Sequence, residues 1–293
     1  MRDLLTPKQV ARAIAASESS VKRWCDKGII PTQYTAGGHR RITMPGLLGF
    51  LREGKHQLVH PEALGLPPTS GQTARVLDRA LQQMTEALIS GDEPRCRQIT
   101  IDLYSAEHDI GVICDDVFAA AFREIGDRWA CGNTEVYEER RGCEIALRVI
   151  YDLRSLLPAP PSGSPLAIGG APAGDQYHLG ATMAELVLRD ANWNAHCLGN
   201  DLPFETLAAA IREQRPKLFW ISCSHIADES EFLNGYHELY QEFGLDVGFV
   251  VGGYALTERL RQQMQYSAYC DNMQHLASFA QTLRSAIEEK QGE

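Results

Sequence analysis

Hydrophobic and polar residues follow two different patterns along the chain. From about residue 75 to residue 157, apolar residues recur every three to four positions, which is the spacing of amphipathic helices. After a Pro-, Gly- and Ser-rich segment at 158–165, short apolar runs alternate with helical stretches. The first pattern predicts a four-helix bundle, and the second predicts a flavodoxin-like, doubly wound parallel sheet.

The periodicity places the individual elements. The bundle helices are expected at 73–90, 93–107, 111–130 and 134–157. Strands are expected at 166–169, 194–198, 218–222, 246–251 and near 268–270, with helices at 178–190, 204–214, 229–243, 255–266 and 273–290. In such sheets, ligands bind at the carboxyl ends of the strands. We therefore expect a site in the loops at 170–177, 200–203, 222–228 and 252–255.

The first 55 residues carry a different set of signals. Thr6 and Pro7 mark a helix start, and Ser17 caps a second helix that runs to about Lys27. A Gly ends that helix, and a Gly-Gly pair at 37–38 turns a short hairpin before a third helix. These signals predict a small domain at 1–55, separated by a linker at 56–73 from the bundle at 74–157. A second linker at 158–165 leads to the α/β domain at 166–293.

Charge divides the chain into a basic head and an acidic body. Residues 1–55 hold 10 Lys and Arg against 4 Asp and Glu, which leaves 18 basic and 34 acidic residues in the remainder. A local basic excess is typical of a surface that meets nucleic acid. The 8 scattered cysteines form no C-x-x-C pair, and no long apolar run occurs. We therefore expect a cytoplasmic protein with free thiols, no membrane span and no metal site.

The N-terminal motifs resemble those of the MerR family of transcription regulators. The resemblance rests on Trp24, on Gly28-Ile29-Ile30-Pro31 and on Gly37-Gly38-His39-Arg40-Arg41-Ile42. It implies a winged helix-turn-helix whose second helix enters the major groove of double-stranded DNA, while the hairpin holds the backbone. The implied DNA-binding residues are Ser19, Ser20, Lys22, Arg23, Tyr34, His39, Arg40 and Arg41.

The remaining two domains resemble the cobalamin-binding module of methionine synthase and corrinoid carriers. Neither a dinucleotide fingerprint nor a P-loop occurs, so a nucleotide-dependent enzyme is disfavoured. Together with the head, the whole chain resembles the adenosylcobalamin-dependent, light-sensing repressors of carotenoid synthesis genes, the CarH/LitR group. In that group the loop after the first strand offers a His to cobalt. A Ser pair and a Gly-Gly turn hold the nucleotide tail of the cofactor, and a Trp and a Glu-His pair cover its upper face.

The resemblance implies a set of cofactor-binding residues. They are Trp129, Glu139, Arg140, Asp175, Tyr177, His178, Gly180, Ser222, Ser224, Gly252 and Gly253. Tyr177 stands at the position of the lower His, His178 follows one residue late, and Arg140 stands at the position of the upper His. A neutral imidazole binds cobalt readily, whereas a phenol must first lose its proton and a guanidinium has no free lone pair.

Three alternatives follow for the module. It binds cobalamin through the tail-binding loops, it binds another tetrapyrrole such as haem through Tyr177 or His178, or it is a cofactor-independent domain for oligomerisation or partner binding. In each case we expect a non-enzymatic, sequence-specific regulator, most simply a repressor, that acts as a dimer or tetramer on a DNA operator and is switched by a signal such as light. The competing functions are a corrinoid methyl carrier and an antirepressor or scaffold protein.

Overall fold

The computed structural model describes residues 4–54, 59–64, 74–132 and 134–292 of the chain. The chain divides into two compact units. The helical unit comprises Met1–Asp109 and Asp116–Pro158, and the α/β unit comprises Ile110–Asp115 and Ala159–Glu293. Within the described residues, no helix has both the length and the apolar character to cross a membrane.

The helical unit begins with a small antiparallel sheet and three helices. In chain order they are β1 (Leu4–Leu5), α1 (Pro7–Ala13), α2 (Glu18–Asp26), β2 (Thr32–Tyr34), β3 (Arg40–Thr43) and α3 (Met44–Gly54). Strand β3 lies between β1 and β2 and pairs with both. Val21, Ile30, Ile42 and Leu47 are fully buried and form the core beneath the helices.

Local signals set the ends of these first helices. Thr6 and Gln9 form a capping box at the start of α1, and the Ser17 hydroxyl accepts the N–H of Ser20 at 3.0 Å. Gly28 has a φ of +70°, a conformation that glycine adopts without strain, and it lets the chain leave α2. The rings of Trp24 and Phe50 lie 5.2 Å apart and join α2 to α3.

Part of the expected linker at 56–73 is structured. The N–H groups of Val59 and His60 donate to the carbonyl of Ala13 at 2.8 and 2.7 Å. A short 3-10 turn, η1 (Pro61–Leu64), follows and contacts α1. The other residues of the expected linker, 56–58 and 65–73, lie outside the described residues.

Four longer helices complete the helical unit. They are α4 (Ala74–Ser90), α5 (Glu93–Ser105), α7 (Ala120–Ala130) and α8 (Val136–Leu156), and they pack against one another around Met84, Leu88, Phe118 and Ile125. The helix expected at 111–130 is confirmed as one continuous helical segment, but its first part is not a regular α-helix. The chain there forms a short helix α6 (Ile110–Val112), a π-helix η2 (Ile113–Ala119) and then α7.

The α/β unit contains the expected parallel sheet, whose strand order is β5-β4-β6-β7-β8. The strands are β4 (Leu166–Gly170), β5 (Asn194–Cys197), β6 (Leu218–Ser222), β7 (Gly248–Gly252) and β8 (Ala268–Cys270), and every neighbouring pair is parallel. After β4 the chain builds β5 on one side and then crosses to build β6 on the other side. The point between β4 and β6 is therefore the topological switch point, where this class of sheet binds ligands.

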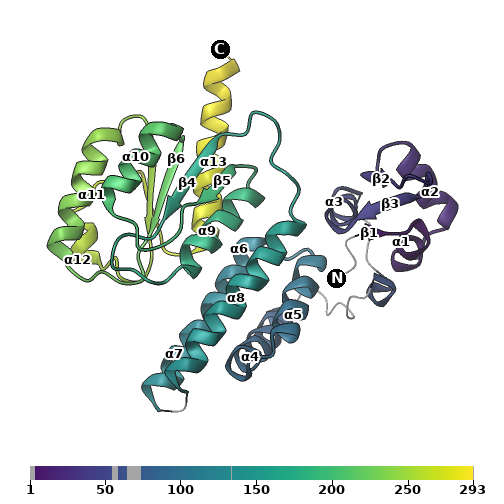
Figure 1. Ribbon diagram of the computed structural model, residues 1–293, viewed down its shortest axis with the longest axis horizontal. Helices are drawn as coiled ribbons and strands as arrows, with labels where there is room; N and C mark the ends of the chain where they lie inside the picture. Colours follow the sequence, from purple (N-terminus) through teal and green to yellow (C-terminus); the bar gives the residue numbers. More distant parts are fainter. Residues whose placement is uncertain (1–3, 55–58, 65–73, 133, 293) are drawn as a thin grey trace. The chain divides into compact units, whose positions relative to one another are not determined.

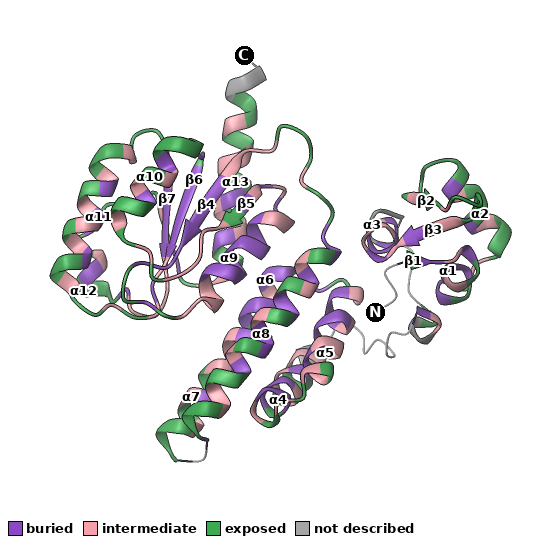
Figure 2. Cartoon of the chain, viewed as in Figure 1, coloured by how far each residue is buried: buried purple, intermediate pink, exposed green. Residues whose placement is uncertain are grey.

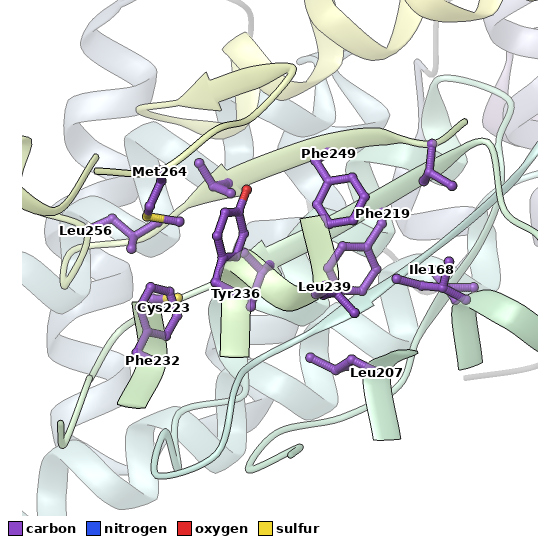
Figure 3. Close-up of a cluster of buried hydrophobic side chains, with 14 residues drawn as sticks. Ile168, Leu207, Phe219, Cys223, Phe232, Tyr236, Leu239, Phe249, Leu256 and Met264 are labelled. Carbon is purple, nitrogen blue, oxygen red and sulfur yellow. The ribbon is translucent and has the colours of Figure 1, made fainter. Parts of the chain in front are cut away.

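Helices cover both faces of the sheet. Helices α9 (Leu179–Asp190) and α13 (Met273–Gly292) lie on one face, and α10 (Phe204–Gln214) and α11 (Glu229–Phe243) lie on the other (Figure 1). The central strands β4, β6 and β7 are accordingly buried along most of their length (Figure 2). On the second face, Ile168, Phe219 and Phe249 pack against Leu207 and Tyr236 (Figure 3).

The helix expected at 255–266 is also wrong, because only α12 (Glu258–Arg261) is helical there. The N–H of Ala255 donates to the carbonyl of Cys223 at 2.9 Å, and the N–H of Leu256 donates to the carbonyl of Gly253 at 3.2 Å. These bonds hold the preceding segment as a loop until Thr257 caps the short helix.

Candidate functional site

Asp175 joins the loop after β4 to the loop after β6 at the switch point. Its side chain is fully buried, and one carboxylate oxygen accepts the N–H of Ser224 at 2.6 Å and of His225 at 3.1 Å. The other oxygen accepts the N–H of Tyr177 at 2.9 Å. A single carboxylate therefore fixes two loops whose residues are about fifty positions apart in sequence.

The loop after β5 adds a third segment to this arrangement. One carboxylate oxygen of Asp201 accepts the N–H of Gly174 at 2.8 Å, and the side-chain amide of Asn200 donates to the carbonyl of Gln176 at 3.0 Å. The N–H of Gly174 lowers the pKa of Asp201, with the Gln176 side chain as the next cause. Three expected ligand loops thus meet at the carboxyl edge of the sheet.

Glycines allow the closest approaches around these loops. A Cβ placed on Gly180, at the start of α9, would lie 2.6 Å from the hydroxyl oxygen of Ser222 at the end of β6. A Cβ on Gly253 would lie 2.3 Å from the carbonyl oxygen of Cys223, and Gly253 has a φ of +108°. Burial, with a smaller contribution from Asp175, raises the pKa of the Cys223 thiol far above its ordinary value. Gly180, Ser222 and Gly252–Gly253 therefore lie beside the loop that Asp175 fixes.

The two residues expected to face a metal differ in their surroundings. Tyr177 is half-buried and donates its backbone N–H to Asp175. His178 lies just before α9, and its Nε2 is 3.5 Å from the Sγ of Cys197 at the end of β5. Cys197 is one of eight scattered cysteines in the sequence, and no motif marks it as a neighbour of His178. Within the described residues, no group of three His, Cys, Asp or Glu side chains is arranged to hold a metal ion.

The remaining three cofactor candidates belong to the helical unit. Trp129, near the end of α7, is 55 % exposed, which is high for a large aromatic side chain. In the first turns of α8, the Nε of Arg140 lies 3.5 Å from a carboxylate oxygen of Glu139. The Sγ of Cys143 donates to the other oxygen at 3.3 Å, and burial together with Glu139 raises the pKa of Cys143 to about 12. Trp129, Glu139 and Arg140 therefore lie in one unit and the loop residues in the other.

The candidate DNA-binding residues lie on α2 and on the hairpin of β2 and β3. Ser19, Lys22 and Arg23 are exposed on α2, and Lys22 pairs with Glu18 at 2.8 Å. Ser20 is half-buried, and its hydroxyl accepts from Ser17. Each of these side chains lies on the outer part of a helix whose inner side carries the buried Val21.

The hairpin presents the other four candidates. Tyr34 and His39 are exposed, while Arg40 and Arg41 are half-buried. The guanidinium of Arg40 donates to a carboxylate oxygen of Asp26 at 2.8 Å, and this hydrogen bond is the main reason that the pKa of Arg40 is raised. The same pair ties the hairpin to the end of α2. The turn itself is closed by the N–H of Gly38 donating to the carbonyl of Thr35 at 2.8 Å.

Comparisons with known proteins find a family model that matches part of this chain. Residues 80–151, which run from α4 into α8, match the family model of the B12 binding domain. A B12-binding domain is present. The match covers the helices that carry Trp129, Glu139 and Arg140, and it leaves the remainder of the chain unassigned.

Two relatives of different function share sequence with the chain. The dimethylamine corrinoid protein of Methanosarcina barkeri is 23 % identical over 214 residues, which are 70 % of this chain and 98 % of that protein. The HTH-type transcriptional repressor CarA of Myxococcus xanthus is 26 % identical over 182 residues, which are 61 % of this chain and 60 % of the repressor. The monomethylamine corrinoid protein of M. barkeri, a solved structure, shares the fold with a TM-score of 0.60 at 15 % identity, over 70 % of this chain and 99 % of that one.

These findings support a cobalamin-type module with an incomplete ligand set. Asp175, Gly180, Ser222 and the Gly252–Gly253 turn lie together at the carboxyl edge of the sheet. The lower position holds a phenol, and the nearby imidazole of His178 lies against Cys197. The residues present therefore fit the frame of a corrinoid site without fitting its cobalt ligation.

Proposed function

We propose that this chain is a DNA-binding transcription regulator, most simply a repressor, whose N-terminal residues bind an operator and whose other domains set the oligomeric state. The observation that carries this proposal is the basic head on an acidic body. The head combines a helix with exposed Lys22 and Arg23 and a hairpin with Arg40 and Arg41. The similarity to a repressor supports the same conclusion.

Phosphate contacts explain why these residues suit duplex DNA. A helix that exposes cations and small hydroxyl side chains fits the major groove, and a basic hairpin beside it reaches the flanking backbone. The Asp26–Arg40 pair holds the hairpin against the end of α2. We infer that α2 and the hairpin contact the DNA as one rigid element, with Arg41 and Arg23 at phosphates and Ser19 and Ser20 facing bases.

Oligomerisation would connect the other domains to DNA binding. Two or more heads on one oligomer bind neighbouring half-sites with a high effective concentration, so operator affinity depends on assembly. A signal that changes the assembly then changes DNA binding without any change in the head. Such a change of assembly needs no chemical step at the module.

A corrinoid methyl carrier is the second candidate, because the dimethylamine corrinoid protein is matched over almost its whole length. That match nevertheless leaves 30 % of this chain outside it. A methyl carrier has no evident use for a basic winged head. Methyl transfer also needs well-ordered cobalt ligation, and Tyr177 occupies the position from which an imidazole would bind.

The decisive experiment measures binding of the intact protein to duplex DNA selected from a random pool. Replacing Arg40 and Arg41 by Ala should abolish retention of the selected duplex, because two cations are lost from the hairpin. The matched control replaces Arg212 and Arg259, two exposed arginines of the α/β unit, and should bind like the unchanged protein. Equal loss in both double variants, or retention in both, would contradict the proposed DNA surface.

A further inference from the structure

Two buried tryptophans fill the layer between the sheet and helices α9 and α13. Trp193, just before β5, is fully buried, and its indole N–H donates to the carbonyl of Ala280 in α13 at 3.1 Å. Trp220, in β6, is 2 % exposed, and its indole nitrogen is buried without a hydrogen-bond partner in the described structure. An unpaired buried donor is unfavourable, so Trp220 is held there by the shape of the space that it fills.

Trp220 lies directly behind Ser222 on the same face of the sheet. Side chains alternate between faces along a strand, and Phe219 and Ile221 belong to the cluster on the α10–α11 face (Figure 3). Trp220 and Ser222 therefore both point toward α9. Two residues of a strand span about 7 Å, so the indole begins roughly 7 Å below the carboxyl edge of the sheet.

Neighbouring glycines show how closely this space is filled. Gly169, on β4, is the register partner of Trp220, and a Cβ on Gly169 would lie 2.3 Å from Cδ2 of the indole. The indole therefore lies over the bare backbone of Gly169. Nearer the edge, the backbone of Gly180 comes so close to Ser222 that a Cβ would lie 2.6 Å from its hydroxyl oxygen. The gap between Gly180 and Ser222 at the sheet edge is therefore narrow, and the indole of Trp220 occupies the space behind it.

One open cavity, of about 890 Å³, lies against α10 and α11 on the opposite face and is also lined by Gly174, Pro203 and Ala227 from the loops after β4, β5 and β6. Another, of about 280 Å³, lies between α4 and α5. Neither is lined by Ser222, Ser224 or Gly252. On the α9 face, behind Ser222, the buried indole of Trp220 fills the space over the backbone of Gly169.

We propose that Trp220 closes the α/β unit to the nucleotide tail of cobalamin. The unit then distinguishes corrinoids only by their ring and upper substituent, and a corrinoid without the tail binds as well as one with it. This inference concerns the module alone and goes beyond the proposed DNA binding, since a regulator with or without a tail slot would bind its operator.

The test compares adenosylcobalamin with adenosylcobinamide, which lacks the nucleotide tail, by absorption titration of the intact protein in the dark. The unchanged protein should bind adenosylcobalamin no more tightly than adenosylcobinamide. Trp220→Ala combined with Tyr177→His should bind adenosylcobalamin at least tenfold more tightly than adenosylcobinamide. Trp193→Ala combined with Tyr177→His is the matched control, because it removes an equally buried indole from the same layer, and it should show no preference.

Two results of this titration would overturn the proposal. One is a tenfold preference of the unchanged protein for adenosylcobalamin. The other is a folded Trp220→Ala, Tyr177→His variant without any preference, or with a preference that the Trp193 control shares.

Indole N–H resonances give a second measurement that does not depend on the folding of any variant. Trp220 is assigned in the ¹H–¹⁵N spectrum of the unchanged protein by its absence from Trp220→Phe, or by triple-resonance connection to its backbone if that variant is unstable. Its signal should stay in place when either diamagnetic cobalt(III) corrinoid is added. If adenosylcobalamin shifts the indole N–H resonance of Trp220 and adenosylcobinamide does not, the nucleotide tail lies at Trp220. That result would refute the proposal that Trp220 excludes the tail.

Discussion

Asp175 offers the sharpest test of how the loops at the switch point are held. Its buried carboxylate accepts the N–H groups of Tyr177, Ser224 and His225 at 2.9, 2.6 and 3.1 Å. A hydrogen bond to a charged acceptor contributes about 1.5–3 kcal/mol, and bonds to one acceptor are less than additive. Asp175→Ala should therefore lower the free energy of unfolding of the α/β unit by about 3–4 kcal/mol.

Urea unfolding measures this loss directly. The experiment follows tryptophan fluorescence in a background where Trp24 and Trp129 are phenylalanine, so that the signal comes from the α/β unit. With a denaturant dependence of about 1.5–2 kcal/mol/M, the midpoint should fall by roughly 2 M. Asp201→Ala, which removes an exposed carboxylate from the same loops, should shift the midpoint much less. A shift below about 0.5 M for Asp175→Ala would refute the role given to its three bonds.

Three further substitutions test separate parts of the structure. Gly180→Ala should lower the free energy of unfolding of the α/β unit by about 1–3 kcal/mol, because the added methyl group would contact Ser222. Adding Ser222→Ala should recover part of this loss. If the effects of the two substitutions on urea unfolding are strictly additive, the contact is contradicted. Burial raises the pKa of Asp102 to about 7, so its proton is bound more tightly in the folded state. The stability of the helical unit should then fall as pH rises from about 4 to 7, and Asp102→Asn should flatten this dependence in thermal unfolding; an unchanged pH profile would argue against it. Asp115 accepts the N–H of Met273 at 2.8 Å, so Asp115→Ala should destabilise the start of α13 by about 1–2 kcal/mol. The loss should appear as faster amide hydrogen exchange at Met273. Unchanged exchange would contradict the role of Asp115 as the cap of α13.

The α/β unit was predictable because its signals are local. Apolar runs bounded by Gly and Pro marked the strands, and helices α10 and α11 begin and end at the residues expected from sequence. The Asp228 carboxylate accepts two N–H groups at the start of α11, and an Asp just before a helix is recognisable in the sequence as an N-cap. The doubly wound parallel sheet is confirmed.

The wrong helix at 255–266 and the π-helix within 111–130 both depend on distant contacts. Leu256, Leu260 and Met264 are all buried at a spacing of four, so the helical period at 255–266 is real although most of the segment is not helical. In the other case, Asp115 accepts N–H groups at the start of α13 from within the π-helix. Those partners lie more than 150 residues later in the sequence, and no local pattern reports them.

Only the loop residues of the candidate site could be predicted from the sequence, and not the contacts between them. Motif spacing selected Asp175, Gly180, Ser222 and Gly252–Gly253, and the structure brings them together. The motif spacing did not predict that Asp175 would accept N–H groups from the loop after β6. Trp220 looked like an ordinary apolar strand residue, because the volume that its indole occupies depends on the glycine opposite it on β4.

The most direct test of the DNA-binding proposal is a salt titration of the intact protein with its selected duplex. If the basic head binds phosphates, the logarithm of the binding constant should fall linearly with the logarithm of salt concentration, with a slope of about −0.9 for each phosphate contact. The Arg41→Ala protein should lose about one such contact per head. Binding that is indifferent to salt, or an absence of binding even in dilute buffer, would contradict the proposal.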